Sequence, residues 1–292
     1  MMKSVDRRSF VTTAALSSGA FLFGRSALAQ QPGTTEPVYR ISKNDAARTE
    51  VAAHPLDPAL QIARDSLKHV RDNVVDYTAI MIKKERIGNT LGEYEYMAAK
   101  VRNRKVHEGQ IKQPFSVYLA FLKPSHVKGR EVIYVENRDN GQVVAHEGGM
   151  RGRFLPTMKL DPTGMLAMQG QRYPITDLGI ENLVIKLIEK GERDRHQDEC
   201  NVEFRRGAKV GGRQCTVLIV THPVPRSYFD FHVAEVFIDD EFQIPVRYAA
   251  YTWPTTEGGP RELLEEYTYQ NVQLNVGLTD ADFDPANKKY NF

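Results

Sequence analysis

The stretch PFSVYLAFLK, residues 114–123, decides the fold because its apolar side chains alternate along the chain. Phe115, Val117, Leu119 and Phe121 fall on one face of an extended strand, in which successive side chains point to opposite faces. Comparable segments, rich in β-branched and aromatic residues and bounded by turn residues, recur along the sequence. We expect ten strands, at 77–87, 94–106, 114–123, 131–137, 142–147, 201–207, 214–222, 229–239, 244–253 and 263–274.

Short turns separate most of these strands. They contain Gly88-Asn89, Asn140-Gly141, Gly211-Gly212 and Asp239-Asp240. Connections of this length join antiparallel neighbours, so the strands are expected to form a meandering antiparallel sheet. In the strand at 229–239, alternation places four further apolar side chains on one face, namely Phe229, Phe231, Val233 and Phe237.

Two helices interrupt the strands. The first begins at Asp57-Pro58, an acceptor side chain followed by a proline in the first turn, and its apolar residues recur at helical spacing. The second is expected to start at Thr176 or Asp177 and to end at Gly191, with Leu183 and Leu187 among its inward residues. Because this second helix is more apolar than a surface helix, we expect it to cover the sheet.

The N-terminal segment carries the features of a signal peptide. Arg7 and Arg8 precede an uncharged apolar stretch from Val11 to Phe23, and Ala27-Leu28-Ala29 provides a small-x-small cleavage site. This order is typical of twin-arginine export, and the apolar stretch is too short to cross about 30 Å of hydrocarbon. The sequence therefore predicts a signal peptide at 1–29 and an exported, periplasmic protein.

The rest of the chain is predicted to be a leader and one domain. Residues 30–55 lack hydrophobic periodicity, which predicts a disordered leader, and residues 56–292 form the domain. Removal of Lys3, Arg7, Arg8, Arg25 and Asp6 changes the formal charge from +2 to −1 (2 − 4 + 1). A nearly neutral chain lacks the clustered basic face of nucleic-acid binders, and after cleavage no segment is long enough to span a membrane.

Cys200 and Cys215 are the two cysteines of the chain. An even number in an oxidising compartment favours a disulfide. A hairpin around Gly211-Gly212 would instead place Cys200 opposite a residue near Val220, and a disulfide needs Cα atoms within about 7 Å. The sequence leaves the bond between them open.

A long loop at 148–175 concentrates methionine. Of the eight methionines, Met1 and Met2 precede the predicted cleavage site, and four of the remaining six lie in this loop. Methionine adapts to varied apolar ligands, although it also fills gaps beneath ordinary loops. We therefore expect an apolar ligand to contact the loop and the second helix, at Met150, Phe154, Met158, Met165, Met168, Leu183 and Leu187.

No catalytic or metal-binding motif is found. The histidines lack metal-ligand spacing, although His222 and His232 could meet across a hairpin. The Asp280, Asp282, Asp284 series fails as a calcium loop, and Thr279 with Asp282 instead predicts a capped final turn. Glu265 and Glu266 are adjacent on a strand, so they point to opposite faces. We expect no cofactor, no metal and no enzymatic activity.

Several stretches resemble an exported bacterial family known as domain of unknown function family 1571. They are Pro114 to Leu119, Lys123-Pro124 with Gly129-Arg130-Glu131 and Ile133-Tyr134, Phe237 to Asp239, Ile244 to Val246, Leu278 to Asp280 with Phe283, and Tyr290 to Phe292. The resemblance runs from about Leu56 to Phe292. More distantly, the chain is similar to periplasmic lipoprotein carriers of the LolA and LolB type.

This resemblance implies an α+β fold, an incomplete antiparallel β-barrel of about ten strands. The N-terminal helix and the central apolar helix would pack in or over its concave face. Such a protein would bind a lipid or an acylated chain there. The alternative is a protein-interaction or sensing module that binds another protein of the cell envelope, and the oligomeric state stays open.

Overall fold

The computed structural model describes residues 34–35, 39–40, 54–152, 154–256 and 258–292. Pro32–Phe292 form one unit and Met1–Gln31 another, and only the first is described below. The predicted signal peptide, with Arg7, Arg8, Ala27 and Ala29, lies outside the described residues, and so does most of the predicted leader.

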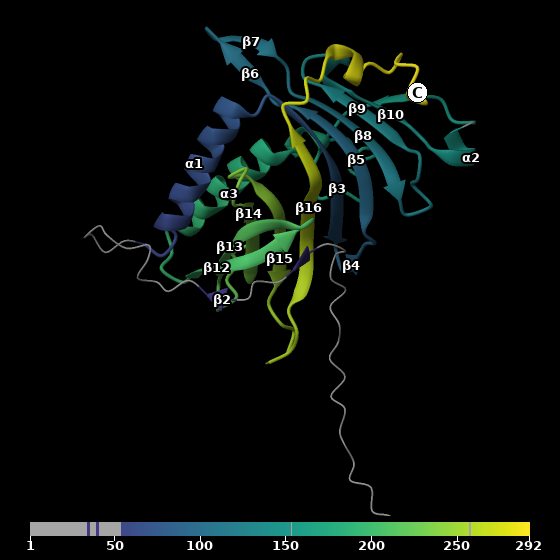
Figure 1. Ribbon diagram of the computed structural model, residues 1–292. Coiled ribbons are helices and arrows are strands. Elements are labelled where there is room, and N and C mark those ends of the chain that lie inside the picture. The colour runs from purple at the N-terminus through teal and green to yellow at the C-terminus, as the bar shows by residue number, and fades with distance from the viewer. Residues whose placement is uncertain (1–33, 36–38, 41–53, 153, 257) are drawn as a thin grey trace, which may run out of the picture. The chain divides into compact units, whose positions relative to one another are not determined.

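The described residues form a 14-stranded antiparallel sheet built from two meanders (Figure 1). The first contains β3 (Asp76–Ile87), β5 (Glu95–Arg102), β8 (Ser116–Lys123), β9 (Glu131–Val135), β10 (Val143–His146) and β11 (Met158–Leu160). The second contains β12 (Asn201–Val210), β13 (Arg213–Thr221), β14 (Val233–Asp239), β15 (Pro245–Thr252) and β16 (Glu262–Leu274).

Pairing between β3 and β16 joins the two meanders, so strands from opposite ends of the domain lie side by side in the middle of the sheet. The sheet does not close, because its outermost strands, β1 (Thr34–Thr35) and β11, pair with inner neighbours and not with each other. The predicted α+β fold with an incomplete antiparallel barrel is confirmed. Each of the ten predicted strands corresponds to an observed one.

The structure adds short strands that the sequence did not indicate. β4 (Thr90–Leu91) pairs with β3, and β6 (Lys105–His107) pairs with β7 (Gln110–Gln113) in a separate hairpin. β1 and β2 (Tyr39–Arg40) both pair with β12. These two short strands lie within the predicted leader, most of which is outside the described residues.

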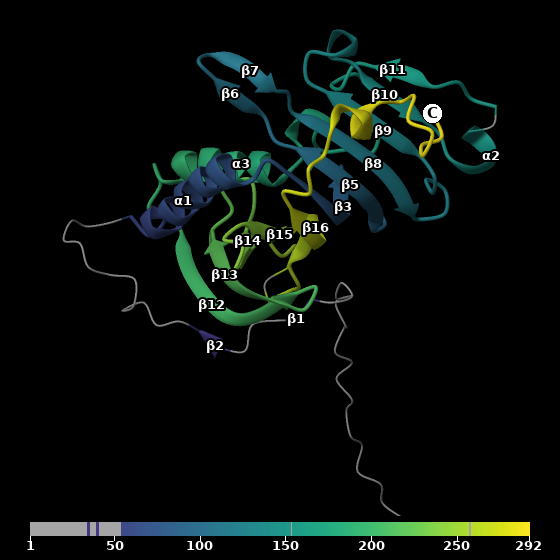
Figure 2. The same ribbon diagram turned by 45° about the horizontal axis from the view of Figure 1, so that its top comes forward.

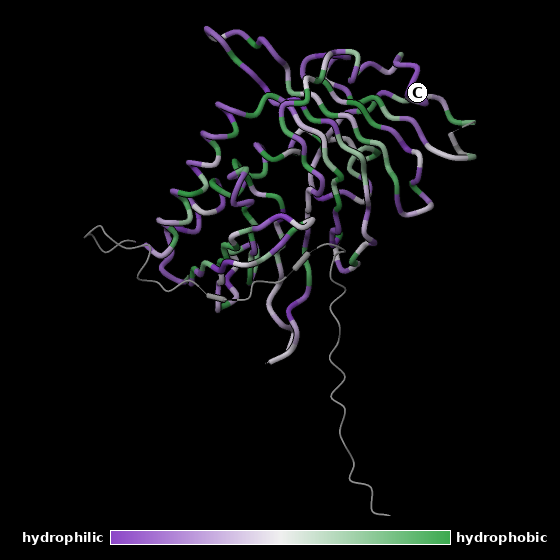
Figure 3. The backbone as a smooth tube through the Cα atoms, in the orientation of Figure 1, coloured by the Kyte–Doolittle hydropathy of each residue, from purple (hydrophilic) through white to green (hydrophobic). Residues whose placement is uncertain are grey.

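Two long helices, α1 (Asp57–Asn73) and α3 (Ile180–Asp194), pack side by side near β12 to β15 (Figures 1 and 2). Hydrophobic and hydrophilic residues alternate along α1, as Figure 3 shows. Gly191 does not end α3 as expected. A Cβ atom there would lie 2.8 Å from Leu60 Cδ2 of α1, so glycine allows the two helices to approach closely.

The start of α3 also differs from the prediction. Thr176 and Asp177 belong to a short 3₁₀ helix, η3 (Ile175–Asp177), and α3 begins after Gly179. Three other short helices are α2 (Gly149–Gly152), η2 (Asp139–Gly141) and η4 (Asp280–Phe283). At η4 the predicted capping box of Thr279 and Asp282 is present, and the Phe283 side chain is fully buried.

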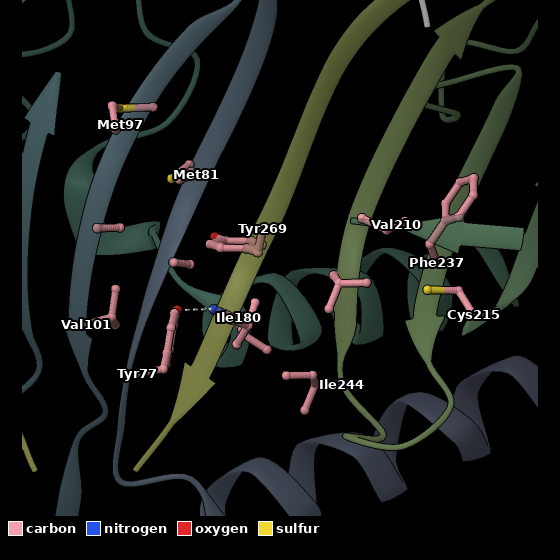
Figure 4. Close-up of a cluster of buried hydrophobic side chains, with 14 of the residues drawn as sticks. Tyr77, Met81, Met97, Val101, Ile180, Val210, Cys215, Phe237, Ile244 and Tyr269 are labelled. Atoms are coloured by element: carbon pink, nitrogen blue, oxygen red, sulfur yellow. Dashed lines mark hydrogen bonds between the residues drawn. The ribbon is translucent and has the colours of Figure 1, made fainter. Parts of the chain in front are cut away.

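The largest core cluster lies between the sheet and α3 (Figure 4). Val117, Leu119 and Phe121 of β8 all belong to it, which confirms the face predicted from their alternation. The common face predicted for Phe229, Phe231, Val233 and Phe237 holds only for the last two, because β14 begins at Val233. Phe231 packs in a second cluster beside α1, whereas Val233 and Phe237 lie in the first.

The two cysteines are buried and not bonded to each other. Cys215 lies opposite Ala208 in the β12–β13 hairpin, within the first core cluster, whereas Cys200 precedes β12 and packs in the second. Burial raises the pKa of the Cys200 thiol to about 11 and that of Cys215 to about 12. The hairpin register therefore separates the two side chains, as the sequence argument against pairing anticipated.

Within the described part of the chain, no helix is long and apolar enough to cross a membrane.

Candidate functional site

A cavity of about 670 Å³ lies between the first meander, α3 and the loop that precedes α3. Its walls come from β3, β5, β8, β9, β10, β11, β15 and β16 on the sheet side. Apolar side chains form much of the lining, among them Met81, Met97, Leu119, Phe121, Val127, Val132, Val143, Ala145, Met158, Leu160, Leu183 and Leu187.

Three of the seven predicted ligand-binding residues line this cavity, namely Met158, Leu183 and Leu187. The other four do not. Met150, Phe154 and Met165 are 77%, 81% and 87% exposed, and Met168 is half-buried outside the lining. The structure therefore does not bring the seven side chains together around one cavity.

The loop contributes to the lining through other residues. Pro162, Leu166, Ala167 and the segment 169–171 face the cavity, followed by Tyr173, Pro174 and Ile175. Met158 lines it because β11 pairs with β10, which places Met158 opposite Ala145. A strand of three residues between Pro156 and Pro162 has too few positions for an alternation to be recognised.

Charged residues occupy one end of the cavity because of the strand register. Glu265 of β16 lies opposite Glu85 of β3, and Tyr267 lies opposite Lys83. Lys83 in turn lies opposite Glu95 of β5. Side chains at paired positions share a face, so these five groups line the cavity together.

Ion pairs connect these groups. Lys83 Nζ lies 3.1 Å from Glu85 Oε2 and 3.1 Å from Glu95 Oε2. From the preceding loop, Arg172 Nε donates to Glu265 Oε2 at 2.9 Å, and the Arg172 backbone N–H donates to Glu85 Oε2 at 3.3 Å. Like charges at paired strand positions repel, and Arg172 reduces that repulsion by contacting both carboxylates.

Tyrosine hydroxyls complete the network. Tyr267 donates a hydrogen bond to Glu85, and the Tyr173 hydroxyl donates to Glu265 Oε1 at 3.2 Å. Burial, together with the charge of Glu265, raises the pKa of Tyr173 and of Tyr267 above the usual tyrosine value. Both hydroxyls therefore stay protonated near neutral pH and act as donors to the carboxylates.

Glu266 faces the other side of the sheet, as its position next to Glu265 predicted. There it accepts a hydrogen bond from the Tyr94 hydroxyl at 3.1 Å, and its Oε1 lies 3.3 Å from Arg247 Nε. What the sequence missed is the pairing of Glu265 with Glu85. No local signal indicates it, because the pairing depends on which strands meet in the middle of the sheet.

His222 and His232 do meet, but mainly through their backbones. The His222 backbone N–H donates to the His232 carbonyl at 2.7 Å. The fully buried His222 ring has its Nε2 3.7 Å from Asp194 Oδ2, which is longer than a hydrogen bond. Burial lowers the pKa of His222 and raises that of Asp194, so it disfavours the charged form of both.

His222 does not line the cavity beside α3. Among the described residues, no group of three or more histidine, cysteine or carboxylate side chains is arranged to hold a metal ion.

A family model described as "Protein of unknown function (DUF1571)" matches residues 74–292 of the sequence. The chain belongs to this family. The match confirms the family that the sequence suggested, although it begins at Val74, after α1, and not near Leu56. No curated protein matches this DUF1571 chain.

Several solved structures are partly similar to this DUF1571 member. A putative outer membrane lipoprotein-sorting protein domain from Vibrio parahaemolyticus has a TM-score of 0.36 and 13% identity, covering 77% of this chain and 95% of that one. A LolA superfamily protein from Nitrosomonas europaea has a TM-score of 0.30 and 8% identity, with 76% and 97% covered. The distant similarity to LolA-type proteins is thus also found among structures.

The MucA/MucB complex of Pseudomonas aeruginosa is a further similar structure. Its TM-score is 0.38 with 14% identity, and the match covers 76% of this chain but only 60% of the matched chain.

Proposed function

We propose that this DUF1571 chain is an exported, periplasmic protein without enzymatic activity that binds a lipid or another apolar ligand in the cavity beside α3. The observation that carries the proposal is the cavity itself. Its volume of about 670 Å³ falls within the range of small-molecule sites, and largely apolar walls with a few convergent polar groups are typical of such sites.

Two measurements test the proposal directly. Purified protein lacking residues 1–29 is extracted with organic solvent and the extract is analysed for lipid. A separate sample of the folded protein is titrated with an environment-sensitive dye, and lipid is then added to displace the dye. We expect lipid in the extract and displacement of the dye, and a protein that yields and binds neither would contradict the proposal.

A variant that fills the cavity tests whether the ligand binds there. Ala145 lines the cavity on β10, so Ala145→Phe is expected to weaken dye binding by about tenfold or more, because the larger side chain occupies the ligand's space. Ala281→Phe is the matched control, since Ala281 is exposed on η4 and does not line the cavity. Thermal unfolding of both variants shows whether the fold is retained.

The alternative is a protein-interaction or sensing module of the cell envelope. The observation in its favour is the exposure of Met150, Phe154 and Met165 on the loop, because large exposed apolar side chains are often covered by partners. Cross-linking in envelope fractions tests it. A single protein captured without lipid, and lost in the Phe154→Ser and Met165→Ser double variant, would favour this alternative.

A further inference from the structure

The polar end of the cavity carries more negative than positive charge. We define the polar end as the lining residues Lys83, Glu85, Glu95 and Glu265 together with Arg172, which contacts Glu265 from the loop behind the lining. Three carboxylates there face two cations, and the pairs between them use both cations. The surplus of one negative charge lies among groups that are largely buried, since Lys83, Glu85 and Glu265 are all buried residues.

Among the described residues, no other cation forms an ion pair with Glu85, Glu95 or Glu265. The remaining charged side chains of the lining, the exposed His126 apart, pair elsewhere: Arg130 with Glu147 at 2.9 Å, Lys186 with Asp177 at 3.5 Å, and Lys190 with Asp230 at 3.3 Å, a carboxylate that Arg193 also contacts at 2.9 Å. A buried charge without a counter-charge is costly, so the polar end favours a ligand that brings a positive group.

Tyr248 supplies an independent observation. This β15 side chain is 4% exposed and lines the cavity, and its hydroxyl lies close to Glu265, the one group able to accept its proton there, while no described group donates to it. Burial and the nearby Glu265 carboxylate raise its pKa, so the hydroxyl is neutral near pH 7. A buried hydroxyl of this kind can accept a hydrogen bond from a ligand at the polar end.

We propose that the ligand is an amphipathic molecule whose polar group is a cationic amine. The ammonium group lies among Glu85, Glu265 and Tyr248, and the alkyl chain lies along the apolar walls formed by Leu119 and Phe121. An ammonium has three donors and no acceptor, which suits a site rich in carboxylate and hydroxyl oxygens. The inference rests on the proposed function and adds the chemical class of the ligand.

The test compares three probes with the same alkyl chain, namely dodecylamine, dodecanol and dodecanoate, the two charged probes below their micelle-forming concentrations and dodecanol below its solubility limit. Their affinities for the delipidated protein are measured by dye displacement and calorimetry at pH 7. We expect the amine to bind about tenfold or more tightly than either other probe, because only the amine neutralises the surplus charge.

Neighbouring glutamates on β16 provide the matched pair of variants. Glu265→Gln removes one charge from the polar end and is expected to abolish most of the preference for the amine. Glu266→Gln is the control, because both residues are 2% exposed but Glu266 faces Tyr94 and Arg247 on the other side of the sheet. It should retain the preference. If Glu265→Gln does not fold, Tyr248→Phe replaces it as the cavity variant. Tyr248→Phe is expected to weaken amine binding.

The outcomes separate the two proposals. If none of the three probes binds, the proposed apolar-ligand function is wrong. If all three bind with equal affinity, or dodecanoate binds most tightly, that function stands and the amine inference is overturned. Equal losses of amine preference in Glu265→Gln and Glu266→Gln would also overturn it, since only the first changes the cavity.

Discussion

Asp239 shows how one buried carboxylate organises the turn between β14 and β15. Its Oδ1 accepts hydrogen bonds from the backbone N–H groups of Glu241 at 3.0 Å and Phe242 at 2.8 Å. Arg213 Nη2 donates to the same oxygen at 2.9 Å. The side chain is only 1% exposed, so these donors replace the water that the carboxylate loses on folding. The turn geometry therefore depends on the negative charge of Asp239.

The pKa of Asp239 makes this dependence measurable. Burial alone would raise the pKa, but the hydrogen bonds from Arg213 and from the turn outweigh it, so the net pKa is below the usual 3.8. A lowered pKa in the folded state stabilises the protein above the unfolded-state value of about 4, and this contribution is lost as the pH falls through the folded-state value.

We therefore expect Asp239→Asn to lower the free energy of unfolding by about 1–3 kcal/mol at pH 7, measured by urea denaturation. The difference from the unsubstituted protein should shrink as the pH falls below about 4, because the wild-type carboxyl then becomes protonated. Asp240→Asn is the control, since that side chain is exposed and accepts a hydrogen bond from the Thr216 hydroxyl at 2.7 Å. A difference that stays constant between pH 7 and pH 3 would contradict the assignment.

Single residues were predictable where the signal is local. Thr279 and Asp282 cap η4 as their spacing indicated, and Glu265 and Glu266 face opposite sides of the sheet. The predicted ligand contacts Met150, Phe154, Met165 and Met168 do not line the cavity. Residue type shows that a methionine can contact an apolar ligand, but not which way the loop turns its side chain.

At the scale of elements, α3 is held at its first residue by the sheet beneath it. The backbone N–H of Ile180 donates a hydrogen bond to the Tyr77 hydroxyl of β3 at 2.9 Å (Figure 4). Tyr77 and Ile180 are both almost fully buried, so water does not replace the Tyr77 hydroxyl as the acceptor for the Ile180 N–H. The first backbone N–H groups of a helix lack partners within the helix, and Tyr77 satisfies one of them.

Tyr77→Phe is expected to destabilise the protein by about 1–3 kcal/mol in urea unfolding, because the Ile180 N–H is left buried without an acceptor. The same change at Tyr228, whose exposed hydroxyl bonds Glu199 at 2.8 Å, should cost less than about 1 kcal/mol. Equal losses in the two variants would show that the bond to Ile180 does not hold α3.

Element prediction succeeded where an alternation stays within one strand. The residues of β8 pair with β5 in one register from Ser116 to Phe121, so their core face was assigned correctly. The alternation counted from Phe229 to Phe237 did not give one common face, because the chain enters the sheet only at Val233. Alternation specifies a common face only while the backbone stays extended in one ladder.

At the scale of the whole molecule, the export prediction depends on Arg7 and Arg8, which lie outside the described residues. The double substitution Arg7→Lys with Arg8→Lys keeps the charge but removes the arginine pair. We expect the full-length protein to accumulate, folded, in the cytoplasm, as measured by cell fractionation and protease resistance. Periplasmic accumulation at the wild-type level would refute export by the twin-arginine route.

The sequence by itself determined the local properties of this protein. Alternation indicated the ten main strands, helical spacing indicated α1 and α3, and short turns indicated antiparallel pairing, because each signal lies within a few adjacent residues. The family was also recognisable from short segments, and the family model confirms it.

Only the tertiary structure decided where the cavity lies and what lines it. Pairing of β3 with β16 places Tyr267 against Glu85, 182 residues away in the chain, and sets Glu265 opposite Glu85. The loop then brings Arg172 to both carboxylates. These contacts depend on the order of strands in the sheet and on the path of a loop. No local sequence pattern encodes either, because the energy of long-range pairing comes from the assembled sheet and core.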